Sequence, residues 1–395
     1  MTSGRTRLWI HSLAKDDLVE ISLSPPAAAS IRGGHPWLFR GSMPVVPAGR
    51  IVRLRAPEGD VVGWGLADEG AIAVRVLGRD EPRGVPGLLR DRITRADAVR
   101  VRLVGPNTDA YRVVSGPGDG LPGLVVDRYG GVAVLRLYAS AWVPYLDDIV
   151  AVLKGLPWVE SVFRRYGVGR VDERDGGETL VGPEVGDHLV VHEDGMALIA
   201  RPHSGQKTGL FLDQREHRSL VGRWAAGRLV VNLFAYTGGF SVAAARGGAA
   251  RVTTVDVAPE AIEDAKENFR LNGFDPAEHA FVVANVFDWT PQGPTDLLIV
   301  DPPSLAKAKR NEGAARSAYR KLHRRLGPWV VRDGLLATSS CTARLSMQAW
   351  AAAVEEGLRQ GDWSWHWRSG GPPDHPVGAG HPEGHYLKFG LLRRR

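Results

Sequence analysis

Three side chains that can do chemistry each follow an apolar run that is typical of a β-strand. Asp256 ends "RVTTVD", Asp301 follows "TDLLIV" and opens "DPP", and Cys341 ends "LLATSSC". In a parallel sheet the carboxyl ends of the strands meet at one edge, and ligands of doubly wound folds bind there. The prolines after Asp301 stiffen the exit from its strand. We therefore expect the two carboxyls and the thiol to share one edge of a sheet.

Cys341 is the only cysteine among the 395 residues. A free cysteine is often a small buried filler, but a thiolate is also a strong nucleophile. Filler has no reason to lie at a ligand-binding edge, so the position favours a nucleophile. A single cysteine also excludes an internal disulfide, which fits a reducing cytoplasm.

A nucleotide-binding block is predicted by "RLVVNLFAYTGGFSVAAARGGA" at 228–249. It indicates a strand, a turn at Gly238-Gly239 and a helix of small residues, whose first N–H groups can face a ligand. Asp256, at the tip of the next strand, can accept hydrogen bonds from ribose hydroxyls. The glycines do not form G-x-G-x-x-G, which disfavours NAD and favours S-adenosylmethionine, a cofactor without a pyrophosphate.

The remaining patterns divide the chain into three predicted parts. Short strands at 18–24, 50–56, 61–67 and 72–78 indicate a small β-barrel, with "GGHPWLFRGSM" as a basic and aromatic turn. A linker and a short helix at 81–98 precede a hairpin that turns at Gly130-Gly131. From about 186 strands alternate with helices, which predicts an α/β fold with a mostly parallel doubly wound sheet. The predicted domains are a barrel at 1–85, a linker with a small α+β middle domain at 86–185, and a Rossmann-like domain at 186–395.

Composition indicates a soluble globular protein, with 44% hydrophobic and 24% charged residues. No apolar run approaches the ~20 residues that span a bilayer, and the start lacks the apolar core of a signal peptide. The formal net charge is +6, and only 8 of the 50 basic residues are lysines. Arginine suits bidentate contact with phosphate, but this modest excess is only weak evidence for nucleic acid.

Taken together, the motifs resemble the RlmI family of bacterial ribosomal RNA cytosine methyltransferases over nearly the whole chain. The resemblance rests on motifs that follow in the family's order: "GHPWLF", "SGQKTGLFLDQREHR" (204–218), "NLFAYTGGFS", "VDVAPEAIEDAKENFRLNG", "DPPSLAKAK", "SSCT" and "DHPVGAGHPEGHYLKF". It implies a PUA barrel, a middle domain and a Rossmann-like class I methyltransferase domain. It further implies methyl transfer from S-adenosylmethionine to carbon 5 of a cytosine in 23S ribosomal RNA or its assembly intermediate, with a homodimer as one open assembly state.

The same resemblance implies site residues. By motif match, Cys341 is the nucleophile and Asp301 the partner of the base. The cofactor is expected to contact Gln214, Asn232, Phe234, Tyr236, Thr237, Gly238, Gly239, Asp256, Asn285, Val286, Asp301 and Pro302. RNA is expected to contact His35, Trp37 and Arg40 on the barrel, and Lys207, Lys307 and Lys309 near the active site. No metal site is predicted, because the spacing of His375, His381, Glu383 and His385 matches no standard site.

The proposed chemistry explains these residue types. A thiolate that adds to carbon 6 makes carbon 5 nucleophilic, and a protonated Asp301 would stabilise the charge that builds on nitrogen 3. A lowered thiol pKa is then expected, with Arg344 and Lys207 as candidate cations near Cys341. The chain departs from the family at Asn285, where an acid is usual, and at His323, where Asn is expected.

Three alternatives remain open. A related guanine-N7 ribosomal RNA methyltransferase has a similar "DPP" loop and needs no nucleophile. The second alternative is a PUA-containing RNA-binding or assembly factor whose methyltransferase half is inactive. The intact motif residues disfavour it. A small-molecule methyltransferase would leave the front barrel without a role.

Overall fold

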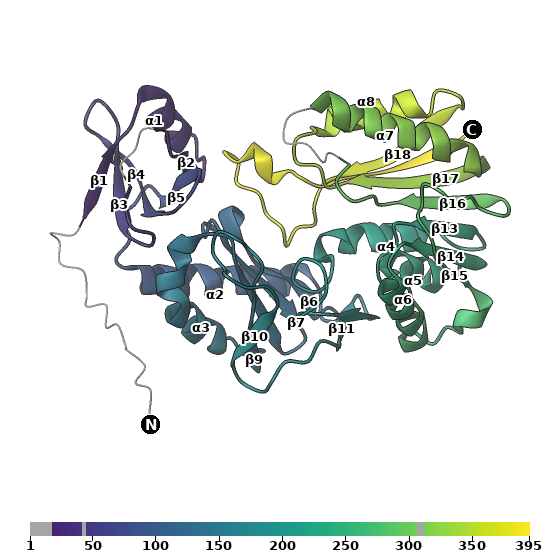
Figure 1. The fold of residues 1–395 in the computed structure, drawn as a ribbon, viewed down its shortest axis with the longest axis horizontal. Coiled ribbons are helices and arrows are strands. Elements are labelled where there is room, and N and C mark those ends of the chain that lie inside the picture. The colour runs from purple at the N-terminus through teal and green to yellow at the C-terminus, as the bar shows by residue number, and fades with distance from the viewer. Residues whose placement is uncertain (1–17, 42–44, 306–311) are drawn as a thin grey trace.

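The computed structural model describes residues 18–41, 45–305 and 312–395. Lys307 and Lys309 therefore lie outside the described residues. The described strands form four sheets, and the chain passes from a small front sheet through a middle sheet to a large one (Figure 1). No helix in the described part of the chain is long and apolar enough to cross a membrane.

The front sheet contains the four predicted strands and one more. Its order is β1-β3-β4-β5-β2, and the strands are β1 (Val19–Ser22), β2 (Trp37–Phe39), β3 (Ile51–Arg55), β4 (Val61–Ala67) and β5 (Ile72–Gly78). Two expectations are wrong. The turn predicted around Trp37 is the strand β2, which pairs with β5. The segment before it is the helix α1 (Pro25–Arg32), in which proline takes the first turn and three alanines favour the helix.

The middle part is a five-stranded sheet with two helices. Its order is β10-β9-β8-β7-β6, formed by β6 (Ala110–Ser115), β7 (Leu124–Tyr129), β8 (Val132–Leu137), β9 (Ser161–Arg165) and β10 (Gly177–Val181), with α3 (Leu146–Lys154). The hairpin at Gly130-Gly131 is confirmed by the pairing of Tyr129 with Val132. The predicted linker and short helix are instead mostly one long helix, α2 (Val85–Leu103), because Leu89, Ile93 and Ala96 form a buried stripe.

The carboxy-terminal half contains the predicted doubly wound sheet. An antiparallel hairpin of β11 (Leu189–Glu193) and β12 (Met196–Ala200) comes first, so the strand–helix alternation starts later than expected. The seven-stranded order is β15-β14-β13-β16-β17-β19-β18, parallel from β15 to β17, with antiparallel β19 and β18 at the end. The elements are α4 (Arg215–Arg223), β13 (Leu229–Leu233), α5 (Gly239–Arg246), β14 (Arg251–Asp256), α6 (Pro259–Leu271), β15 (Ala280–Val283), β16 (Thr295–Val300), α7 (Glu312–Leu326), β17 (Val330–Ser340), α8 (Met347–Gly357), β18 (Trp363–Ser369) and β19 (Lys388–Arg394).

Helices cover both faces of this sheet. α4, α5 and α6 lie on one face and α7 and α8 on the other (Figure 1). β13 has β14 on one side and β16 on the other, so the winding direction reverses between β13 and β16. Ligands of doubly wound folds bind at such a switch point. Trp367 of β18 is 52% exposed, so the tryptophan side chains of this strand are only partly covered.

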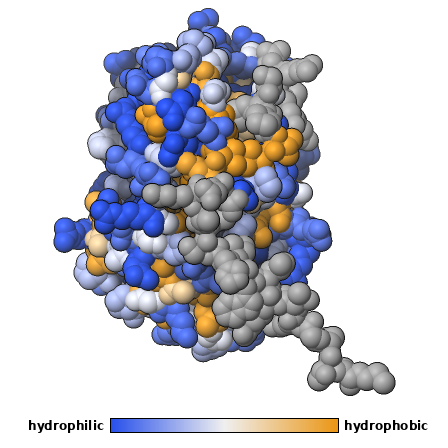
Figure 2. All heavy atoms as spheres, turned by 90° about the vertical axis from the view of Figure 1, so that its left-hand side faces the viewer, coloured by the Kyte–Doolittle hydropathy of each residue, from blue (hydrophilic) through white to orange (hydrophobic). Residues whose placement is uncertain are grey.

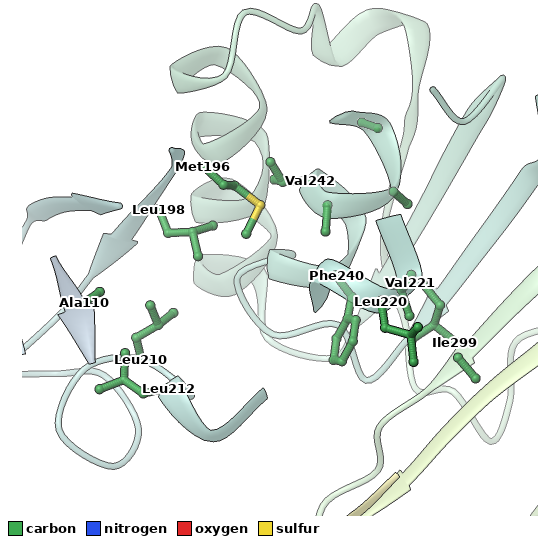
Figure 3. Close-up of a cluster of buried hydrophobic side chains, with 14 of the residues drawn as sticks. Ala110, Met196, Leu198, Leu210, Leu212, Leu220, Val221, Phe240, Val242 and Ile299 are labelled. Atoms are coloured by element: carbon green, nitrogen blue, oxygen red, sulfur yellow. The ribbon is translucent and has the colours of Figure 1, made fainter. Parts of the chain in front are cut away.

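One apolar core joins the middle part to the large sheet. Ala110 of the middle sheet belongs to the same buried cluster as Leu198, Leu210 and Phe240 (Figure 3). A predicted domain boundary at 185/186 therefore falls inside a continuous hydrophobic contact. The domain limits stay predictions, and the two parts bury apolar surface against each other.

The segment between β18 and β19, residues 370–387, is called the strap below. It leaves the large sheet and extends toward the front barrel before it returns (yellow in Figure 1). Its backbone approaches the barrel closely, since a Cβ on Gly380 would lie 2.2 Å from the carbonyl oxygen of Gly33.

Candidate active site

The two carboxyls and the thiol lie at one edge of the large sheet, as expected. Asp256 is the last residue of β14, Asp301 follows β16 and Cys341 follows β17. β16 and β17 are parallel neighbours with Val300 opposite Thr338, which brings Asp301 level with Ser339. The Ser339 hydroxyl donates a hydrogen bond to the Asp301 carboxylate.

Asp301 is held from a second side by Gln214, which precedes α4. The Gln214 amide Nε2 donates to Asp301 Oδ2 at 3.0 Å, and Gln214 Oε1 lies 2.5 Å from His217 Nδ1. Burial raises the pKa of Asp301 to about 6, although the hydrogen bonds from Ser339 and Gln214 oppose this rise. The site therefore has a carboxyl group that can gain or lose a proton near neutral pH.

Cys341 is partly buried, and its surroundings disfavour the thiolate. Burial first, and then the charge of Asp301, raise the pKa of the thiol, while Lys207 acts in the opposite direction. The expectation of a lowered thiol pKa is therefore wrong, because both desolvation and a neighbouring carboxylate disfavour a thiolate. Lys207 is near, as expected, but its ammonium pairs with Asp213 at 2.5 Å.

Two residues around the thiol were missed by sequence reasoning. The Tyr319 hydroxyl of α7 lies 3.3 Å from Thr342 Oγ1. The Lys388 ammonium of β19 donates to the Thr342 carbonyl at 2.5 Å. The only available signal for Lys388 was a charged residue inside the apolar "YLKFGLL" run.

The turn between β13 and α5, at which the sequence predicts the cofactor, has a strained backbone and is held in place by Asp256. Phe234 and Tyr236 have φ values of 56° and 49°, which are unusual for residues with a Cβ. Gly238 has a φ of 73°. Asp256 Oδ2 accepts from the Tyr236 N–H at 2.7 Å and Oδ1 from the Ala258 N–H at 3.0 Å. At Gly238 a Cβ would lie 2.8 Å from the Cβ of Ala265, so the close approach of α6 also requires this glycine.

Polar groups beneath the turn fix it further. Asn232 is fully buried, and its Nδ2 donates to Ser241 Oγ at 2.9 Å while its Oδ1 has no partner among the described residues. The Thr237 carbonyl accepts from Asn268 at 2.7 Å. Gly239 faces Arg218, because a Cβ on this glycine would lie 3.0 Å from Arg218 Cδ. A buried acceptor without a partner is unusual, and it offers a place for a donor of a bound molecule.

An aromatic wall stands beside this turn. The rings of Phe234 and Phe287 meet edge to face with centroids 5.9 Å apart, and Phe287 is half exposed. Asn285 closes a local turn, since its Oδ1 accepts from the Phe287 N–H at 3.1 Å and its Nδ2 donates to Asp288 at 2.6 Å. Val286 in the same loop and Pro302 after β16 are both buried. Phe287 was missed by sequence reasoning, although it lies two residues after Asn285.

The residues expected to contact RNA from the barrel are engaged within the chain. The Trp37 ring packs on His381 of the strap with centroids 4.5 Å apart, and His35 Nε2 lies 3.6 Å from Glu383. Arg40 donates to the carbonyls of Gly70 and Asp68 at 2.8 and 2.5 Å. The fold therefore brings His35 and Trp37 to the strap and not directly to the thiol.

The histidines of the strap have other partners. His375 is buried and lies 3.2 Å from Asp374, and His381 packs on Trp37. In the portion of the chain that the structure describes, no group of three His, Cys, Asp or Glu side chains could hold a metal ion.

Comparison with known proteins defines the class. A family model for a PUA-like domain matches residues 21–79. A second, for S-adenosylmethionine-dependent methyltransferases, matches residues 157–369 and so begins within the predicted middle domain. The fold is thus that of an S-adenosylmethionine-dependent methyltransferase.

Relatives narrow the class to a family. The chain is 36% identical to a ribosomal RNA large subunit methyltransferase of Deinococcus radiodurans, over 95% of this chain and 97% of that protein. It is 32% identical to ribosomal RNA large subunit methyltransferase I of Alteromonas mediterranea, over 93% and 97%. The solved structure of SMU.776, a methyltransferase complexed with SAH, superposes with a TM-score of 0.85 at 25% identity and covers 95% of this chain and 100% of that one. The chain belongs to the ribosomal RNA large subunit methyltransferase family, and the resemblance to RlmI is confirmed.

Proposed function

We propose that this protein methylates carbon 5 of a cytosine in large-subunit ribosomal RNA through a covalent bond to Cys341. The observation that carries the proposal is the placement of the only cysteine beside Asp301, at the ends of neighbouring strands β17 and β16. The names of the relatives support the ribosomal RNA substrate. A reaction at guanine N7 would need no thiol at this position.

Cys341 and Asp301 divide the chemistry. The thiolate forms a bond to carbon 6, and the displaced electron pair moves through the ring toward nitrogen 3, where a proton from Asp301 stabilises it. S-adenosylmethionine supplies the electrophilic methyl group that carbon 5 attacks. As carbon 5 forms its bond to the methyl group, the proton on nitrogen 3 returns to the Asp301 carboxylate. A general base then removes the carbon-5 proton, and that electron pair forms the carbon 5–carbon 6 double bond and expels the Cys341 thiolate.

The two pKa shifts fit this division. The pKa of Asp301 is about 6, so a bound cytosine that hydrogen-bonds to the protonated carboxyl can keep this carboxyl neutral. The Asp301 charge is one of the causes that raise the thiol pKa. Neutralising Asp301 on base binding therefore also favours the Cys341 thiolate, so that the nucleophile forms when a base is present.

The cofactor is assigned to the turn after β13. Asp256 accepts the ribose hydroxyls with its remaining lone pairs, and Asn232 Oδ1 accepts a donor at the floor of the turn. Phe234 and Phe287 flank the adenine, and the loop at Asn285 and Val286 lies at its edge. Tyr236, Thr237, Gly238 and Gly239 form the turn itself, while Gln214 and Pro302 position Asp301 next to the transferred methyl group.

RNA contact is assigned to two regions. The barrel with His35, Trp37 and Arg40 binds RNA at a distance from the reacting base. Lys207 is proposed to contact a phosphate near it, and the same role for Lys307 and Lys309, which lie outside the described residues, rests on the sequence alone. Aromatic and basic side chains are the usual means of contacting unpaired RNA.

A 5-fluorocytosine RNA tests the proposal. The final proton is replaced by fluorine and cannot be removed, so the enzyme should remain attached to the RNA through denaturing electrophoresis, and only with S-adenosylmethionine. Cys341→Ser should lose both adduct and methylation but keep cofactor affinity. A fully active Cys341→Ala enzyme would exclude the covalent mechanism and favour guanine N7. Bisulfite sequencing of ribosomal RNA with and without the gene then locates the product.

A further inference from the structure

Lys388 is a buried cation that the proposed chemistry does not yet use. It opens β19, and its side chain is 1% exposed. Its ammonium donates to the carbonyls of Thr342 and Tyr386 at 2.5 and 2.8 Å. An ammonium has three hydrogens to donate, and no ion pair joins Lys388 to a carboxylate among the described residues. A buried charge without an anion is unfavourable, so this position calls for a negative partner.

The register of the sheet brings this charge to the segment that carries Cys341. β19 pairs with β17, and Lys388 lies opposite Ser340, the residue before Cys341. Its hydrogen bond goes to Thr342, the residue after Cys341. Lys388 is therefore paired with the residue before Cys341 and hydrogen-bonded to the carbonyl of the residue after it. A cavity of about 580 Å³ bordered by Lys388, Ala343, Ser346 and Glu383 opens beside this turn.

Other charged groups around the thiol do not provide a net positive charge. Asp301 comes from β16, while Asp213 and Lys207 come from the segment before α4, where they neutralise each other in an ion pair. Tyr319 of α7 is neutral at physiological pH because burial raises its pKa to about 12. Asp301, Asp213 and Lys207 together therefore place one net negative charge beside Cys341.

We propose that Lys388 is a positioning residue whose ammonium stabilises the Cys341 thiolate and fixes the turn that carries it. This role rests on the proposed use of Cys341 as nucleophile. It acts together with Lys207, whose charge also lowers the pKa of the thiol. Burial lowers the pKa of Lys388 to about 8, and interaction with Cys341 raises it, so the two groups titrate as a coupled pair.

The single cysteine permits a direct test on the full-length protein without RNA. Iodoacetamide forms a thioether with the Cys341 thiolate, iodide leaves, and the thiol proton passes to the buffer, so the rate measured against pH reports the thiol pKa. Lys388→Met should shift this profile upward by about one pH unit and lower the rate at pH 8 about tenfold. Lys266→Met removes a partly exposed lysine that pairs with Glu263 and should leave the profile unchanged.

Two further measurements separate charge from packing. Lys388→Arg keeps the positive charge and should restore the alkylation rate that Lys388→Met loses, with folding of both variants checked by thermal unfolding and cofactor calorimetry. The wild-type profile needs no variant: coupling to a lysine that titrates near pH 8 should make it broader than a single ionisation. A single-ionisation curve in the wild type, or an unchanged profile in folded Lys388→Met, would overturn the proposal. An active Cys341→Ala enzyme would instead refute the cytosine mechanism. The alkylation profiles of the wild type and of the Lys388 variants would not be affected by that result.

Discussion

At the scale of single residues, the negative charge of Asp301 and that of a Cys341 thiolate disfavour each other. A charged Asp301 raises the pKa of the thiol, and burial raises the pKa values of both groups. The site therefore disfavours two negative charges at once, so that either the Asp301 carboxyl or the Cys341 thiol keeps its proton until a substrate redistributes it. Such electrostatic tension is common where residues are selected for reaction and not for stability.

This tension predicts a stability gain for Asp301→Asn that depends on pH. The native carboxyl has a pKa of about 6 against an ordinary value of 3.8, so ionising it in the folded state is unfavourable. Stability from this group is therefore complete below pH 3.8 and is lost as the pH rises through 6. At pH 8 the neutral amide should stabilise the fold by about 3 kcal/mol, and at pH 4 the difference should nearly vanish. Thermal unfolding at both pH values measures this, and an equal gain at both would show that charge is not the cause.

Asp256→Ala should weaken binding of S-adenosylmethionine. The change removes the proposed ribose acceptor and also the anchor of the Tyr236 and Ala258 N–H groups. Loss of a hydrogen bond to a charged group is worth about 1.5–3 kcal/mol, which is roughly a tenfold to hundredfold loss of affinity. Calorimetry measures it, with Glu263→Ala on the exposed face of α6 as control. Unaltered affinity would place the cofactor elsewhere.

At the scale of elements, the strap links three parts of the chain through Asp374. Its carboxylate accepts two hydrogen bonds from Arg215 of α4, both at 2.9 Å, and one from the Arg112 N–H of β6 at 3.0 Å. Burial alone would raise the pKa of Asp374, but His375 and Arg215 outweigh it and hold the pKa well below its usual range. The strap is thus pinned at its start by a buried ion pair and at its end by Lys388.

Asp374→Ala should release the strap. It leaves the buried Arg215 without its anion, and breaking a buried pair in this way costs about 3–5 kcal/mol. Hydrogen exchange across residues 370–387 should accelerate and denaturation should occur earlier. Asp362→Ala breaks a pair with Arg395 in which both side chains are more than half exposed, so it should change stability by about 1 kcal/mol or less. Similar effects of the two variants would contradict the anchoring role.

At the scale of the whole molecule, the barrel is attached at two places. Asp68 accepts from Ser140 Oγ at 2.7 Å and from the Ala141 N–H at 3.1 Å in the middle part, and Trp37 packs on the strap through His381. Figure 2 shows the side of the molecule on which the barrel lies, where hydrophilic residues surround smaller hydrophobic areas. Residues 18–85 contain eight Arg against seven Asp and Glu, so this part is nearly neutral.

Removal of residues 1–80 should leave cofactor affinity intact and weaken RNA binding. Because the barrel is nearly neutral, the slope of log affinity against log salt should fall only by about one for each phosphate that the barrel no longer neutralises. Filter binding of ribosomal RNA fragments at several salt concentrations measures both quantities. RNA affinity that persists unchanged in a folded truncation would assign the barrel another role.

The sequence by itself determined the strands that carry Asp256, Asp301 and Cys341 and the edge on which they meet. Those features depend on local apolar runs and on glycine or proline at their ends, which act within a few residues. Only the tertiary structure decided which side chains surround them. Lys388 reaches Thr342 because β19 returns beside β17, and Trp37 meets His381 because the strap crosses to the barrel. Contacts between residues so distant along the chain depend on how whole elements pack. The local spacing of apolar residues in the sequence carries no information about them.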